Sequence, residues 1–353
     1  MGTFQLVKVK GATPTERGRQ YGVQARDKIR AGIESYRELF AKTLSHTWEE
    51  TRQYALSYVP LIRQRMPEVL EEAEGIALGA GVDFGDLMVV NCRYEITKFP
   101  REKECTTAAI LPEASQGGKT LLVKNWDLRI GVIDNIVVLS IEEPDGTCVL
   151  GLTEAGQLMR EGFNSHGVGL CNNSLQSVYD TRGVGIPVTF LRRKVLASKT
   201  FDEAKELLLT ATRSVSNNML LASSDGRAVD IEAHPKGADI IEPSEGIVTH
   251  ANHFVVNKDL NALGTSPRGD RLRELLMRKH GEITVPYIKE CMSDHENYPH
   301  AICRHPADVS VPRAMRSGTV ASLIIDFQER TAHICAGPPC QGEFVEYTFE
   351  TGV

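Results

Sequence analysis

Cys105 and Asp127 are the residues best suited to catalysis, and they lie near the two ends of a sequence typical of a β-hairpin. Cys105 follows a charged cluster at 101–104 and opens a run of small and β-branched residues. After the turn Gly117-Gly118, an apolar run returns and leads to Asp127. A thiol placed there would suit a nucleophile whose own amino group becomes the base once the preceding peptide bond is broken. Taken alone, a single cysteine is more often a small buried hydrophobic residue.

Asn252 lies between His250 and His253 at the tip of another predicted strand. Either histidine could pair with Cys105, although the sequence signature that surrounds the nucleophile of papain-like proteases is absent. Asn252 could donate its amide N–H to an oxyanion, or it could be an ordinary turn residue. The residues alone leave these alternatives open.

A segment in the C-terminal third gathers several side chains that could bind a soft metal. Their spacing is irregular and matches no common zinc module, so a polar loop around 297–299 is the favoured interpretation and no metal is expected. A metalloprotein would instead carry stoichiometric zinc here. The residues concerned are Cys291, His295, His300, Cys303 and His305.

Composition and charge exclude several classes of protein. The 353 residues, 41% hydrophobic and 24% charged, are typical of a soluble globular chain, and the net charge of −6 argues against nucleic-acid binding. No apolar run is long enough to span a membrane, and no phosphate-binding or dinucleotide motif follows a strand. Eight scattered cysteines favour a reducing, cytoplasmic environment.

The elements that would position these residues change in type along the chain. After one strand, roughly the first hundred residues are predicted to be helical, beginning with a capping box at Thr13 and Glu16. Short β-type runs follow from Cys105 to Gly169, and helices then alternate with strands. This order predicts an α+β fold in which two helical layers cover a largely antiparallel pair of sheets. The later strands are expected at 132–141, 147–152, 219–222, 228–233, 247–253, 322–327, 331–336 and 344–349, and the later helices at 186–209, 268–280 and 285–292.

Six separated motifs, in order over nearly the whole chain, resemble the isopenicillin N acyltransferase family. They are Glu104-Cys105-Thr106-Thr107, Asn125-Trp126-Asp127, Thr153-Glu154-Ala155-Gly156, Gly162-Phe163-Asn164-Ser165, His250-Ala251-Asn252-His253, and Asn297-Tyr298-Pro299 with Ile302-Cys303-Arg304. The resemblance implies an N-terminal nucleophile hydrolase with a four-layer αββα sandwich. Such a protein forms a single domain, 1–353, and cuts itself into a helical segment, 1–104, and a β-rich segment, 105–353.

The same resemblance assigns roles to individual residues. The cut would fall between Glu104 and Cys105, after which Cys105 attacks an amide or thioester carbonyl. Its free α-amino group, with an ordinary pKa of about 7.7–8.0, would act as the base. By the family pattern Asp127 orients this amino group, Asn252 donates to the oxyanion, and Arg316 lies close to the nucleophile.

One departure from the family pattern concerns the residue before the nucleophile. The penicillin enzyme has glycine there, whereas this chain has Glu104. Glycine tolerates a strained backbone that assists an N→S acyl shift, and glutamate does not. We therefore expect self-cleavage to be slow or to use a different local geometry.

The sequence thus predicts a self-processing cysteine amidohydrolase that acts on a small N-acyl or peptide-like amide without a metal or organic cofactor. The alternatives are an acyl-CoA-dependent N-acyltransferase of the penicillin type and an unprocessed small-molecule-binding protein. No nucleic-acid or membrane partner is expected, and the sequence allows a homo-oligomer.

Overall fold

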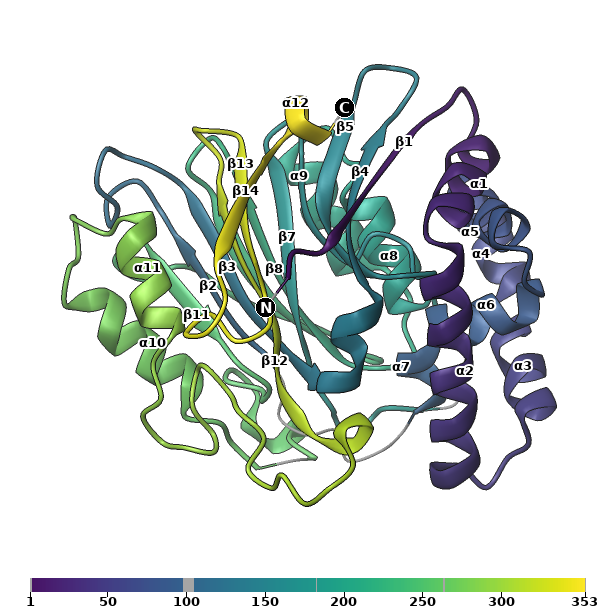
Figure 1. Cartoon of the computed structure of the whole chain (residues 1–353). Coiled ribbons are helices and arrows are strands. Elements are labelled where there is room, and N and C mark those ends of the chain that lie inside the picture. Colours follow the sequence, from purple (N-terminus) through teal and green to yellow (C-terminus); the bar gives the residue numbers. More distant parts are fainter. Residues whose placement is uncertain (1, 98–104, 182, 263, 353) are drawn as a thin grey trace.

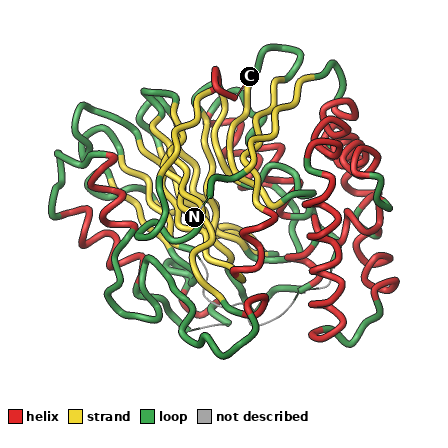
Figure 2. Tube along the Cα trace, viewed as in Figure 1, coloured by secondary structure: helices red, strands yellow, loops and turns green. Residues whose placement is uncertain are grey.

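Two β-sheets lie face to face between two layers of helices in the computed structural model (Figures 1 and 2). The structure describes residues 2–97, 105–181, 183–262 and 264–352. Glu104, the residue before the predicted cleavage point, lies outside these ranges. The predicted four-layer αββα sandwich is confirmed.

The first sheet has eight strands in the order β1-β4-β5-β6-β7-β8-β9-β10. β1 runs parallel to β4, and every other neighbouring pair is antiparallel. The strands are β1 (Gln5–Lys10), β4 (Ile136–Glu142), β5 (Cys148–Glu154), β6 (Glu161–Asn164), β7 (Val168–Ser174), β8 (Asn217–Ser223), β9 (Ala228–His234) and β10 (Gly237–Ile241).

The second sheet has six antiparallel strands in the order β11-β2-β3-β12-β13-β14. The pairing of β3 with β12 shifts register between Thr319 and Ala321, beside the pair Thr319–Asp127. The strands are β2 (Thr106–Ile110), β3 (Leu121–Arg129), β11 (Ile247–His250), β12 (Ser317–Asp326), β13 (Thr331–Ala336) and β14 (Phe344–Thr348).

The N-terminal helices and α8–α9 cover the eight-stranded sheet, whereas α10 and α11 cover the six-stranded sheet on the opposite side of the molecule (Figure 1). The helices are α1 (Pro14–Gln24), α2 (Arg26–Thr43), α3 (Trp48–Leu56), α4 (Val59–Arg65), α5 (Pro67–Ala80), α6 (Phe84–Asn91), α7 (Arg93–Ile96), α8 (Val188–Val195), α9 (Phe201–Thr210), α10 (Arg268–Met277), α11 (Val285–Met292) and α12 (Phe349–Gly352).

Three apolar clusters fill the spaces between the layers. The largest lies between the N-terminal helices and the eight-stranded sheet, a second between the two sheets, and a third beneath α10 and α11. Cys105 and Trp126 belong to the cluster between the sheets. The strands that carry the predicted site are therefore buried on both faces, which explains why their sequences show little alternation.

Local sequence signals set several of these elements. Thr13 and Glu16 form the predicted capping box of α1, and Gly81 ends α5 in the left-handed conformation with φ 62°. Glycines then let α1 and α5 pack backbone against backbone. A Cβ added to Gly79 would come within 2.1 Å of the Arg19 carbonyl oxygen.

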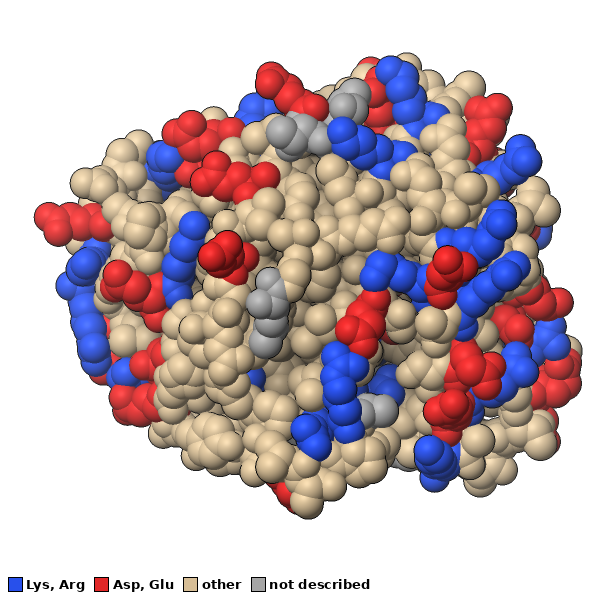
Figure 3. All heavy atoms as spheres, viewed as in Figure 1, with Lys and Arg blue, Asp and Glu red and all other residues tan. Residues whose placement is uncertain are grey.

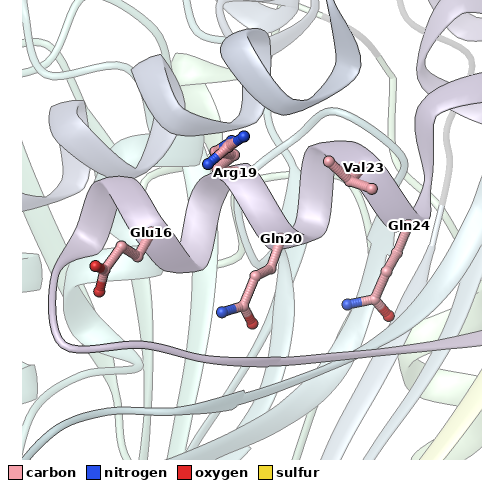
Figure 4. Close-up of a pocket in the computed structure, with 5 residues that line it drawn as sticks. All are labelled: Glu16, Arg19, Gln20, Val23 and Gln24. Atoms are coloured by element: carbon pink, nitrogen blue, oxygen red, sulfur yellow. The ribbon is translucent and has the colours of Figure 1, made fainter.

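β1 forms one edge of the eight-stranded sheet, and side chains of α1 cover it. Gln20 exchanges hydrogen bonds with the backbone of Lys10, and Gln24 does so with Lys8. These amide groups occupy the hydrogen-bonding positions of a further strand, which protects the edge from pairing with other chains. A hollow of about 370 Å³ lies beside this contact on α1 (Figure 4), and no predicted site residue lines it.

Three details of the predicted elements are wrong. The strand expected over 132–141 begins only at Ile136, because Ile130–Asn135 forms a 3-10 turn whose first amide donates to the Arg316 carbonyl. β12 begins at Ser317 rather than at 322, and β10 was not expected at all. In each case tertiary pairing, which local composition does not encode, decides the boundary.

Among the described residues, no helix is long and apolar enough to cross a membrane. Lysine and arginine side chains alternate with acidic ones over the face shown in Figure 3, without a broad area of one sign.

The close approach of α1 and α5 predicts a large cost for one added methyl group. Gly79→Ala should lower the free energy of unfolding by about 1–3 kcal/mol, because a backbone carbonyl cannot move aside as a side chain can. Gly32→Ala in α2 is the matched control, since its nearest heavy atom would lie at 3.6 Å. This control should be neutral or stabilising by up to about 1 kcal/mol. Denaturant unfolding of both variants measures the difference, and equal effects would contradict the packing argument.

Candidate active site

Cys105 lies immediately before β2, at the start of the central hairpin of the six-stranded sheet, and is 2% exposed. Its φ angle is 91°, far from the values that a residue with a Cβ ordinarily adopts. A backbone held in such a region stores of the order of 1–3 kcal/mol of strain, and strain of this kind is concentrated at functional sites.

Asp127 lies on β3, beside Cys105, and is fully buried. Its Oδ2 accepts a hydrogen bond from the Cys105 backbone nitrogen at 3.3 Å, and its Oδ1 accepts one from the Thr319 hydroxyl at 2.7 Å. The Cys105 thiol lies 3.9 Å from the Asp127 carbonyl oxygen. The carboxylate therefore points at the nitrogen that cleavage would convert to an α-amino group.

Arg268, the first residue of α10, joins the predicted site residues. Its Nη1 lies 3.5 Å from Asp127 Oδ2, and its Nη2 donates to the Cys105 carbonyl at 3.2 Å and to Asn252 Oδ1 at 2.6 Å. The Asn252 amide nitrogen in turn donates to Ser174, at 3.0 Å to the carbonyl and 3.3 Å to the hydroxyl. The structure thus brings Cys105, Asp127 and Asn252 together around one buried guanidinium.

Arg316 is not part of this set of contacts among the described residues. Its guanidinium donates to the carbonyls of Val309 and Val311, in the loop before β12. It lines a surface hollow of about 190 Å³ together with Arg304, at the end of β12 nearest to Asp127. Arg268, by contrast, directly contacts the carbonyl oxygen of Cys105.

Both histidines beside Asn252 have partners other than Cys105 among the described residues. His250 is buried, and its Nε2 lies 2.7 Å from Glu232 while its Nδ1 donates to the Ala251 carbonyl at 2.8 Å. Burial lowers the pKa of His250, but the charges of Asp230 and Glu232 outweigh it and leave the pKa raised. His253 Nδ1 accepts from the Ser266 amide.

Two buried cations lie on the side of β3 that faces the eight-stranded sheet. Lys124 Nζ contacts Glu161 at 2.5 Å and the Asn172 carbonyl at 2.6 Å, and the Arg160 guanidinium lies 4.2 Å from the centre of the Trp126 ring. Burial raises the pKa of the Cys105 thiol, and the charges of Lys124 and Arg160 oppose that shift only in part. The thiol therefore needs a base to become a nucleophile near neutral pH.

Tyr94, on α7, contacts Arg160 and two further buried arginines. Arg160 donates to its hydroxyl at 2.5 Å, and Arg93 and Arg192 lie within cation–π distance of its ring. Burial alone would raise the pKa of Tyr94, but the three guanidinium groups bring it down to about 8. The interior around the nucleophile is consequently rich in cations and suits a substrate or product with a negative charge.

The contribution of Arg268 was missed in the sequence, although one signal was present. A cation in the first turn of a helix is unfavourable, because that end of the helix carries a partial positive charge. Arg268 follows Pro267 at the very start of α10, so a buried anionic partner was to be expected there. Lys124 and Glu161 gave no comparable signal, since only the pairing of distant strands brings them together.

The sequence matches, over residues 114–341, the family described as Acyl-coenzyme A:6-aminopenicillanic acid acyl-transferase. The chain belongs to this family. The matched region includes Asp127, Asn252 and Arg316 and begins after Cys105. Membership confirms the resemblance noted in the motifs and makes the protein an enzyme of the amide hydrolase and acyltransferase class, acting on small acyl substrates.

Several individual proteins are similar to this chain. The chain is 26% identical over 334 residues to the Acyl-coenzyme A:6-aminopenicillanic-acid-acyltransferase 40 kDa form of Emericella nidulans, an alignment that covers 93% of this family member and 91% of the relative. Among solved structures, the Caenorhabditis elegans N-acylethanolamine-hydrolyzing acid amidase (NAAA) ortholog matches with 16% identity and a TM-score of 0.48, over 63% of this chain and 93% of that one. A variant of the conjugated bile acid hydrolase from Clostridium perfringens matches with 12% identity and a TM-score of 0.47, over 69% and 97%.

The buried contact between Asp127 and Arg268 predicts strong energetic coupling. In a Cys105→Ala background, either Asp127→Asn or Arg268→Met should cost about 3–5 kcal/mol of unfolding free energy, because each leaves an uncompensated buried charge. The double variant should cost clearly less than the sum. Denaturant unfolding of the parent, the two single variants and the double variant measures this coupling, and additive costs would contradict it. The exposed pair Asp134–Arg313 is the control, and its removal should cost at most about 1 kcal/mol.

The arginine cluster predicts that one tyrosine ionises early. In the folded protein Tyr94 should ionise with a pKa of about 8, whereas an unfolded tyrosine has a pKa of about 10. Phenolate absorbance should show this step in the wild type and should lose it in Tyr94→Phe. The control Tyr36→Phe should keep it, because burial raises the pKa of Tyr36 and this residue does not ionise in the same range.

The lowered pKa of Tyr94 also makes the unfolding free energy depend on pH. Because the pKa of Tyr94 is lowered on folding, its contribution is fully present above the unfolded pKa and is lost as the pH falls to about 8. Relative to Tyr94→Phe, the unfolding free energy of the wild type should therefore rise between about pH 8 and about pH 10. A flat difference over this range would contradict the lowered pKa.

Proposed function

We propose that this protein is a self-processing cysteine amidohydrolase of the N-terminal nucleophile type, with Cys105 as its nucleophile. The observation that carries the proposal is the hydrogen bond from the Cys105 nitrogen to the buried Asp127 carboxylate. A nitrogen held in this position has a catalytic use only after it becomes a free amine. Cleavage between Glu104 and Cys105 would produce that amine.

Processing would begin with an N→S acyl shift. The Cys105 thiol attacks the carbonyl carbon of residue 104, the peptide C–N bond breaks, and the proton moves to the departing nitrogen. Water then hydrolyses the thioester, which leaves a carboxylate on residue 104 and a free thiol and amine on Cys105. The strained φ of Cys105 supports this step, because cleavage removes the constraint that maintains the strain.

The mature enzyme would use the same residues on an external substrate. The α-amino group takes the thiol proton, the thiolate attacks an acyl carbonyl, and the amine leaving group takes the proton as the C–N bond breaks. Water then hydrolyses the acyl-enzyme. Asp127 orients the amine, and Asn252 donates to the oxyanion by exchanging its longer bond, the one to the Ser174 hydroxyl.

Arg268 would serve as the positioning residue for this set. It holds the Asp127 carboxylate and the Asn252 amide oxygen at once, so that the amide nitrogen of Asn252 faces away from it. Arg316 and Arg304 would instead act on the substrate from the hollow at the end of β12. Arginines there suit an acyl compound that carries a carboxylate.

We propose a small N-acyl amide as the substrate and water as the favoured acceptor. The relative from Emericella nidulans is described as an acyl-coenzyme A:6-aminopenicillanic-acid acyltransferase, so transfer to an amine is the second candidate.

The free thiols of all eight cysteines agree with the prediction of a cytoplasmic location.

Intact mass under denaturing conditions tests the processing step. The wild type should give two fragments that divide between Glu104 and Cys105, and Cys105→Ala should remain one chain. Cys171→Ala, which removes another buried thiol of the same apolar layer, should still divide. An uncut wild type would contradict the proposal and favour the unprocessed binding protein.

Product analysis separates the two reactions once a substrate has been found among N-acyl amides. Hydrolysis predicts free acid at a rate that added amines leave unchanged. Transfer predicts a new amide in place of the acid, and faster turnover when an acyl-CoA and an amine acceptor are supplied together.

A further inference from the structure

Four side chains that can bind a metal converge at one point beside the six-stranded sheet. They are His295, Cys303, His305 and Cys340, and their ligand atoms all lie within 4.8 Å of one another. The two Nε2 atoms are 3.1 Å apart, the two sulfurs are 3.5 Å apart, and His305 Nε2 lies 3.7 Å from Cys303 and 3.2 Å from Cys340.

These separations are close to the edges of a zinc tetrahedron. With zinc bonds of about 2.3 Å to sulfur and about 2.05 Å to nitrogen, two sulfurs lie about 3.8 Å apart, a sulfur and a nitrogen about 3.6 Å, and two nitrogens about 3.3 Å. Each of these four separations agrees with its expected edge to within about 0.4 Å.

Hydrogen bonds use only part of the close contacts among these four groups. His305 Nε2 faces one nitrogen and two sulfurs, yet it offers either one N–H or one lone pair, which can be directed well at only one of the three. A cation at the centre accepts electron pairs from all four atoms at once. Two nitrogens and two sulfurs in a tetrahedral arrangement form the donor set that favours zinc.

We propose that His295, Cys303, His305 and Cys340 bind one Zn²⁺ ion. Binding releases the two thiol protons to solvent, and the two thiolates then neutralise the charge of the ion. This assignment revises the sequence-based interpretation of this segment as a polar loop without metal. Of the five ligands considered there, Cys291 and His300 are not part of the cluster, and Cys340 was missed because it lies far along the chain, after β13.

The proposed ion would tie together three segments of the chain: the loop after α11, the segment that leads to β12, and the turn after β13. Between two of the ligands lies Arg304, whose amide donates to the Thr319 hydroxyl at 2.9 Å and whose carbonyl accepts from the Thr319 amide at 3.0 Å. Thr319 in turn donates to Asp127. The site therefore clamps the segment that supports the buried carboxylate, although the proposal is independent of the reaction assigned to Cys105.

Metal analysis of the full chain, purified without chelator, tests the proposal. We expect about one zinc ion per chain in the wild type, and equally in Cys105→Ala, so that the outcome does not depend on processing. Replacement by Co²⁺ should give the visible absorption of a tetrahedral site together with a thiolate-to-cobalt charge-transfer band.

Matched variants separate ligands from neighbours. His295→Gln and Cys340→Ser should lose most of the metal, whereas His300→Gln in the same loop and Cys148→Ser at another partly exposed thiol should retain it. Chelation should lower the melting temperature of the wild type, and added zinc should restore it.

Two results would overturn the proposal. One is a wild type without zinc that also binds none when the reduced protein is titrated with it. The other is a Cys303–Cys340 disulfide, which the sulfur separation also allows. It would appear as two thiols fewer than the eight of the sequence when the denatured, unreduced protein is titrated.

Discussion

The burial of the Asp127 carboxylate is the constraint on which the rest of the site depends. A charge removed from water in this way is tolerated only when hydrogen-bond donors and a counter-ion surround it. Here the donors come from the residue before β2 and from β12, and the counter-ion comes from α10. The α10 layer is therefore required by the chemistry of β3 as well as by the apolar cluster beneath it.

A second set of buried charges lies between the two sheets. Lys124 spans from the six-stranded sheet to Glu161 on the eight-stranded one, so the two sheets are joined by an ion pair as well as by apolar contacts. The cost of burying such a pair is high, and its presence next to Cys105 indicates a functional rather than a stabilising purpose. Positive charge near the thiol lowers the free energy of a thiolate and of an oxyanion alike.

The sequence predicts features whose residues lie close together along the chain better than contacts between distant segments. The capping box at Thr13, the glycine at the end of α5 and the hairpin at Gly117-Gly118 are local signals, and the structure contains all three. Cys105 and Asp127 could be paired because one short hairpin carries both. Arg268 meets Cys105 across 163 residues, and Cys340 meets Cys303 across 37, in both cases through the tertiary arrangement of separate elements, so no spacing in the sequence points to these contacts.

The arrangement of bases explains why processing and activity would be coupled. The thiol of Cys105 has its pKa raised by burial, so it requires a proton acceptor. His250, two residues before Asn252, already contacts Glu232 and the Ala251 carbonyl, and the Asp127 carboxylate accepts from the Cys105 nitrogen rather than pointing at the sulfur. Among these groups, only the nitrogen of Cys105 could become a base, and it cannot do so while it remains an amide. A chain that kept the bond after Glu104 would thus hold a buried, protonated thiol, and a single cleavage would supply the missing base at the position where the carboxylate already holds it.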